Sequence, residues 1–62
     1  LYDELVNQIG KTLTVLRPSG KAELNGQIVD VVSTGFVIPE NTRIQVVKVE
    51  GSKIVVQALE NK

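Results

Sequence analysis

Turn-forming residues divide most of this 62-residue chain into segments that are too short for helices. After Lys11 the segments between turns are short and rich in Val, Ile and Thr. These β-branched residues fit the pleated, half-buried surface of a strand, whereas a helix usually needs about ten residues or more. The pattern therefore predicts an all-β domain, either a small barrel or a sandwich.

Two of the expected strands carry apolar side chains at both odd and even positions. Residues 27–32 and 43–50 fit either strands buried partly on both sides or strands with a β-bulge. Bent strands suit a small barrel, and closure of the barrel removes exposed sheet edges. We therefore predict a five-stranded barrel of the OB type. The segments expected to form its strands are residues 12–17, 21–24, 27–32, 36–38, 43–50 and 53–59.

The first ten residues have a different pattern from the rest of the chain. Leu1, Leu5 and Ile9 fall on one helical face, and Gly10 stands where a glycine often follows a helix. The expected divisions are a linker or short helix at residues 1–10, the barrel at residues 11–60 and a tail at residues 61–62.

Glycine, proline and asparagine mark the expected turns. Asn25-Gly26 is the strongest hairpin signal, because a type I′ turn needs positive φ at both central residues. Pro18 and Gly20 have the spacing of the second and fourth positions of a tight turn. Asn41 is the residue of its loop best able to adopt positive φ. The residues expected in turns are Pro18, Gly20, Asn25, Gly26, Gly35, Asn41 and Gly51.

Gly20-Lys21 could be the end of a phosphate-binding loop. A Walker A loop reads G-x-x-x-x-G-K-[ST], but Val15 stands in place of its first glycine and Ala22 in place of its hydroxyl residue. We also expect no helix after it whose N-terminus could bind phosphate. We therefore predict a turn here, with Lys21 starting the next strand.

The residue types needed for several catalytic sites are missing. The chain has no Cys and no His, which excludes a Cys/His zinc site and the Ser-His-Asp and Cys-His arrangements. A Ser-Lys dyad needs a buried lysine, yet Ser19 with Lys21 and Ser52 with Lys53 lie in expected turns. Asp30 interrupts an apolar strand, and we interpret it as facing solvent or a backbone amide. We expect no catalytic, cofactor-binding or metal-binding residue in this domain.

Charge and aromatic content argue against nucleic-acid binding. The seven basic and seven acidic residues are scattered and give zero formal net charge, without the basic stripe typical of such proteins. Single-strand binding also uses stacking aromatics, and the chain has only Tyr2 and Phe36. Phe36 lies beside Val37 and Ile38, where we expect a core role. Because the shape of an OB-type barrel itself suggests oligonucleotide binding, an oligonucleotide-binding barrel is the alternative function.

No segment of the sequence is long enough to cross a bilayer. The longest unbroken apolar runs hold three residues, as at residues 54–56, whereas a membrane-spanning helix needs about 20. We expect no signal peptide within these residues. Because the chain begins with Leu1 rather than Met, we expect it to be a piece of a longer protein.

The remaining hypothesis is a barrel that contacts another protein or a neighbouring domain through exposed apolar side chains. Along each strand, every second side chain must fill the core, while the side chains between them face outward. The candidate contact residues are Leu16, Leu59 and Tyr2, the last of these on the apolar side of residues 1–9.

Four ordered segments resemble the C-terminal domain of the NfeD family. That domain typically reads L-x-P-x-G, then a short strand, then an acidic-aliphatic strand that ends V-V-S-x-G, and then I-x-x-G and V-x-V-x-x-V-x-G. The corresponding segments here are residues 16–22, 24–26, 29–38 and 43–51. Where the family usually has glycine before the long strand, this chain has Asn41, which also tolerates positive φ.

The resemblance implies an OB-fold barrel that belongs to a membrane-anchored bacterial or archaeal-type protein. Members of the family carry upstream transmembrane helices, and longer members also carry a ClpP-like serine protease domain with a Ser-Lys dyad. They are usually encoded beside stomatin- or flotillin-type membrane scaffold proteins. The resemblance therefore predicts a non-catalytic interaction domain, which contacts such a scaffold protein or neighbouring domains that include an attached protease.

The expected type I′ hairpin gives a first testable prediction. We expect Gly26→Val to lower the free energy of unfolding by about 1 kcal/mol or more, because valine is strained at positive φ. The melting temperature of the variant, compared with that of the parent chain, measures this loss. An unchanged melting temperature would contradict the hairpin.

Overall fold

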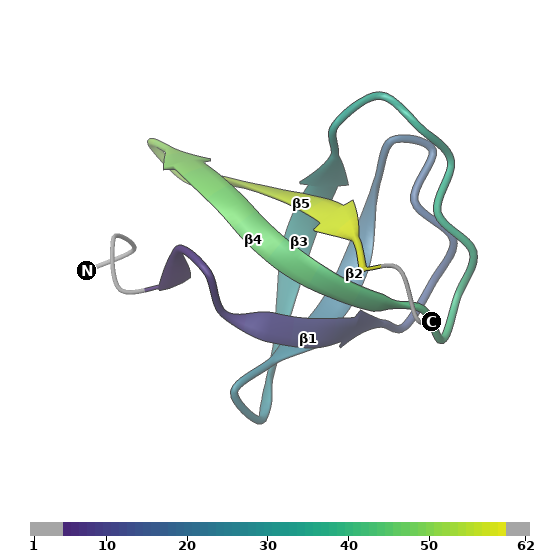
Figure 1. Cartoon of the computed structure of the whole chain (residues 1–62), viewed down its shortest axis with the longest axis horizontal. Coiled ribbons are helices and arrows are strands. Elements are labelled where there is room, and N and C mark those ends of the chain that lie inside the picture. The colour runs from purple at the N-terminus through teal and green to yellow at the C-terminus, as the bar shows by residue number, and fades with distance from the viewer. Residues whose placement is uncertain (1–4, 60–62) are drawn as a thin grey trace.

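Two antiparallel hairpins and one short strand build a closed barrel (Figure 1). The computed structural model describes residues 5–59. Its strands are β1 (Ile9–Thr12), β2 (Ser19–Leu24), β3 (Gln27–Ser33), β4 (Arg43–Glu50) and β5 (Lys53–Ala58). They follow one another around the barrel in the order β1-β2-β3-β5-β4, and β4 pairs with β1 to close it. This five-stranded arrangement confirms the predicted OB-type barrel.

The two hairpins form as local sequence rules predict. Asn25 and Gly26 connect β2 and β3 with φ values of 55° and 80°, which are the signs that a type I′ turn requires. Gly51 connects β4 and β5 at a φ of 58°. The pairing of β4 with β5 shifts between Val46 and Lys48, so the parity switch in β4 is a β-bulge. In β3 burial alternates regularly without a bulge, and Ile28 is exposed on the outer face.

The core is aliphatic and draws on the strands and on both long loops. Leu5, Val29 and Val49 pack against it from the side. The buried cluster consists of Leu16, Ala22, Leu24, Val31, Ile38, Ile44, Val46, Ile54 and Val56. No helix among residues 5–59 is long and apolar enough to cross a membrane.

Thr12 is a fully buried polar residue at the end of β1. Its hydroxyl donates a hydrogen bond to the Pro39 carbonyl (2.7 Å) and accepts one from the Thr42 amide (2.9 Å). Its backbone amide donates to the Thr42 carbonyl, and its carbonyl accepts from the Asn41 amide, both at 2.9 Å. Asn41 has a φ of 62°, which confirms the predicted positive value. One threonine therefore fastens β1 to the loop that leads into β4.

The beginning of the barrel differs from the sequence prediction. The strand expected at residues 12–17 is wrong, because β1 covers Ile9–Thr12 and residues 13–18 form a loop. Gly10 does not end a helix: it pairs with Leu24 and Ile44, and a Cβ atom there would overlap the Glu23 carbonyl oxygen. The barrel thus starts at Ile9 rather than at residue 11. Leu1 and the tail at residues 61–62 lie outside the described residues.

Gly20 has a different role from the predicted turn residue. It lies within β2 opposite Val31, and the turn falls one step earlier, at the cis peptide bond between Arg17 and Pro18. A Cβ atom on Gly20 would lie 2.5 Å from Thr14 Oγ1 and 2.8 Å from the carbonyl oxygen of Val15. Glycine is therefore required by the close approach of the β1–β2 loop.

The segment at residues 36–38 is a loop rather than the predicted strand. Only Ile38 pairs, through an isolated bridge to Leu16 in which each amide donates to the other carbonyl (2.9 and 3.1 Å). This bridge holds the β1–β2 and β3–β4 loops beside each other, on the right in Figure 1. Gly35, in the same loop, has a φ of 122°, as expected for a turn glycine.

The crowding at Gly20 gives the second prediction. We expect Gly20→Ala to lower the free energy of unfolding by about 1–3 kcal/mol, because the added methyl group overpacks the loop. Gly26→Asn is the control, since its site has no atom within 4 Å of an added Cβ and asparagine tolerates positive φ. Thermal unfolding of both variants measures the difference. Equal melting temperatures for the Gly20→Ala variant and the parent would contradict the close approach.

Candidate functional site

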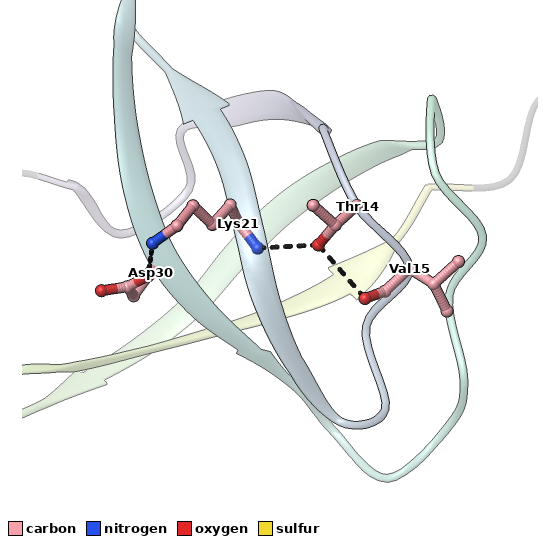
Figure 2. Close-up of polar contacts among 4 residues, drawn as sticks. All are labelled: Thr14, Val15, Lys21 and Asp30. Carbon is pink, nitrogen blue, oxygen red and sulfur yellow. Dashed lines mark hydrogen bonds and ion pairs between the residues drawn. The ribbon is translucent and has the colours of Figure 1, made fainter.

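The outer face of β2 and β3 is the usual ligand-binding face of an OB barrel. Lys21 and Asp30 face each other across these two strands, and the Lys21 ammonium donates a hydrogen bond to Asp30 Oδ1 (Figure 2). The Lys21 amide also donates to Thr14 Oγ1 at 3.0 Å. Both charged side chains are exposed, so the pair stabilises the fold by about 1 kcal/mol at most. Asp30 faces solvent, as interpreted from the sequence, and its carboxylate compensates the charge of Lys21.

A shallow hollow runs from this ion pair toward the β4–β5 turn. Its lining includes Ile28, Ser52 and Ile54 in addition to Lys21 and Asp30. None of these side chains is aromatic, and the lysine is already paired. Base stacking on aromatics in a positively charged groove therefore has no basis on this face.

The two Ser-Lys pairs considered in the sequence lie on exposed surface. Ser19 and Lys21 belong to the same strand, β2, and the Lys21 ammonium contacts Asp30. Ser52 and Lys53 are exposed at the β4–β5 turn. A Ser-Lys dyad needs a buried lysine, and Lys21 and Lys53 are both exposed.

A second surface lies on the β3–β4 loop, around Phe36 and Val37. Their side chains are 77% and 64% exposed, and Phe36 is the only aromatic residue among residues 5–59. The prediction that Phe36 is a core residue is therefore wrong. Its neighbour Ile38 takes the core position instead, because the bridge to Leu16 turns Ile38 inward.

Hydrogen bonds fix the loop on both sides of Phe36. The buried Ser33 hydroxyl donates to the Phe36 carbonyl and accepts a long hydrogen bond from the Gly35 amide (3.5 Å). On the other side, the Ile38 amide and carbonyl bond to Leu16. The exposed apolar side chains are thus presented by an anchored backbone.

Phe36 and Val37 form a ridge between two hollows. One hollow is also lined by Arg17, Pro18 and Gly35, and the other by residues that include Pro39 and Ala58. Arg17 is exposed and forms no ion pair within residues 5–59. We call this region the Phe36 surface. It comprises Arg17, Pro18, Phe36, Val37, Pro39 and Ala58.

The contact residues proposed from the sequence have different environments. Leu16 is 0% exposed, so its assignment to an interaction surface is wrong: the bridge to Ile38 places its side chain in the core. Leu59 is half-buried, and its amide donates to the Arg43 carbonyl. Tyr2 lies outside the described residues. Phe36 was missed, although its position between Gly35 and Pro39 makes the segment too short for a regular strand.

The sequence of the chain matches one family across almost its whole length. Residues 2–57 match the model described as the NfeD-like C-terminal, partner-binding domain. The chain belongs to the NfeD family. The resemblance found in the turn pattern is therefore confirmed, and the family description is that of a partner-binding domain.

A curated relative agrees with this assignment. Membrane protein NfeD1b of Bacillus subtilis (strain 168) is 41% identical over 56 residues, which are 90% of this chain. These residues are only 13% of that protein, so the chain corresponds to a small part of it.

Two solved structures have the same fold. The C-terminal domain of stomatin operon partner protein 1510-C from Pyrococcus horikoshii superimposes with a TM-score of 0.87 at 22% identity, covering 95% of this chain and 94% of that one. The other is the soluble domain of a membrane protein implicated in regulation of membrane protease activity, from Corynebacterium glutamicum. Its TM-score is 0.82 at 22% identity, covering 90% of this chain and 94% of that chain.

The anchoring of the Phe36 loop gives the third prediction. We expect Ser33→Ala to lower the free energy of unfolding by about 1 kcal/mol, because the Phe36 carbonyl and Gly35 amide lose a partner. We also expect lower ¹⁵N order parameters at residues 35–37, which report faster backbone motion. Thr34→Ala is the control, since Thr34 is an exposed neighbour. Unchanged order parameters in Ser33→Ala would mean that the hydroxyl does not hold the loop.

Proposed function

We propose that this NfeD domain is a non-catalytic docking module of a membrane-anchored protein, and that its partner is a stomatin- or flotillin-type scaffold protein. The observation that carries the proposal is the exposure of Phe36, at 77%, on a loop that hydrogen bonds hold in place. Exposed aromatics in anchored loops are typical of protein-binding sites, because little conformational entropy is lost when they bind.

The choice of partner draws on the relatives of the chain. The Pyrococcus horikoshii protein with the same fold is a stomatin operon partner, and the Bacillus subtilis relative is a membrane protein. A partner in the same membrane also suits a small domain, because tethering raises the effective concentration of one protein near the other. Contact with an attached protease domain is the variant of this proposal suggested by the Corynebacterium glutamicum protein, which is implicated in regulating membrane protease activity.

The fourth prediction tests the partner directly. The full-length membrane protein is purified in detergent with the stomatin- or flotillin-type protein of the same organism, alongside a variant that lacks residues 5–59. We expect the scaffold protein to co-purify with the full-length protein and to be lost from the deletion variant. If the scaffold protein co-purifies with neither form, the proposed partner is wrong. Equal recovery with both forms would place the contact outside this domain.

A fluorescence anisotropy titration with a labelled single-stranded oligonucleotide is the companion measurement. We expect a flat titration at low salt, because Asp30 compensates Lys21 and the face carries no aromatic residue. Binding that weakens steeply as salt rises would instead support the oligonucleotide-binding barrel.

A further inference from the structure

The Phe36 surface has the shape of a ridge rather than a groove. Phe36 and Val37 line both neighbouring hollows, so they stand between them. A ridge that carries one large aromatic side chain fits a concave apolar pocket on another molecule. Further apolar residues line both hollows: Pro18 lines one, and Pro39 and Ala58 line the other together with the polar Thr34 and Gln57.

One unpaired charge stands beside this ridge. Arg17 lines the same hollow as Phe36, and no ion pair within residues 5–59 involves it. Lys21 and Lys48 are paired with Asp30 and Glu50, whereas Arg17, like Lys11, Arg43 and Lys53, has no ion-pair partner within residues 5–59. Arg17 differs from the other three in lining a hollow beside Phe36. A guanidinium next to an apolar anchor complements a carboxylate on the rim of the opposing pocket.

We propose that Phe36 is the anchor residue of this NfeD domain, inserting into an apolar pocket of the partner protein while Arg17 pairs with a carboxylate on the pocket rim. This inference rests on the proposed function and assigns its contact site and the chemistry of the partner surface. Ser33 is a positioning residue in this arrangement, because its hydroxyl holds the Phe36 carbonyl.

Two other occupants fit the charges less well. A symmetric contact with a second copy would place two Arg17 guanidiniums in one interface, and the residues that line the two hollows include no carboxylate to pair with them. A lipid surface would need a cluster of basic residues to add to the apolar contact, and the chain has zero formal net charge with a single arginine at this ridge.

The chain offers matched controls for both parts of the proposal. Ile28 is 68% exposed on the outer face of β3 and lines neither hollow beside Phe36. Lys53 is an exposed cation near the β4–β5 turn, and it also lies away from those hollows. The two test residues, Phe36 and Arg17, and the two control residues are all exposed, so their substitution leaves the core intact.

The fifth prediction is measured as the Kd between the full-length protein and the scaffold protein, in detergent. We expect Phe36→Ala to weaken binding about 30-fold or more, and Ile28→Ala to change it by about twofold or less. Arg17→Glu should weaken binding about 3- to 10-fold at low salt, with a smaller effect at high salt, whereas Lys53→Glu should have little effect.

The outcomes separate this inference from the proposed function. If the unsubstituted protein binds the scaffold and Phe36→Ala binds equally well, the anchor is overturned while the docking function stands. If the unsubstituted protein does not bind, the docking function fails and the anchor fails with it. Flotation with phosphatidylglycerol vesicles and sedimentation equilibrium complete the test. Loss of vesicle binding or of a dimer in Phe36→Ala would overturn the protein pocket in favour of a membrane or a second copy.

Discussion

The bridge between Leu16 and Ile38 is the constraint on which the loop end of this barrel depends. It joins two loops by a reciprocal pair of backbone hydrogen bonds and buries both side chains in the core. The β1–β2 loop is thereby drawn against β2, which leaves space at residue 20 only for glycine. The same bridge fixes one side of the segment that carries Phe36. Core packing and surface presentation therefore come from one contact.

A chain of this size buries a limited share of its surface, so polar contacts to loop backbone carry unusual weight. Thr12 makes four hydrogen bonds to the loop before β4, and Ser33 makes two within the loop after β3. Both hydroxyls are buried and fully satisfied, which avoids the penalty of a buried polar group without a partner. These side chains make long loops behave as extensions of the rigid barrel.

Sequence reasoning predicted what local rules govern. The type I′ turn at Asn25-Gly26, the positive φ of Asn41 and the five-stranded barrel follow from residue preferences that act over a few positions. The roles of Gly20 and Phe36 depend on contacts between loops far apart in the chain, which no local pattern contains. Most of the candidate site therefore cannot be predicted from the sequence. The sequence predicts Leu16 on the surface and Phe36 in the core, but the bridge between Leu16 and Ile38 places Leu16 in the core and leaves Phe36 exposed.

The two surfaces of the barrel differ in whether their exposed side chains already have a partner within residues 5–59. On the β2–β3 face the Lys21 ammonium is paired with Asp30, so a charged ligand there would compete with an existing contact. On the Phe36 surface, an aromatic side chain and the Arg17 guanidinium both lack an opposing group within residues 5–59. Binding energy comes from groups that gain a partner in the complex. In the proposed docking function, the groups that would gain a partner therefore lie at the loop end of the barrel rather than on the β2–β3 face.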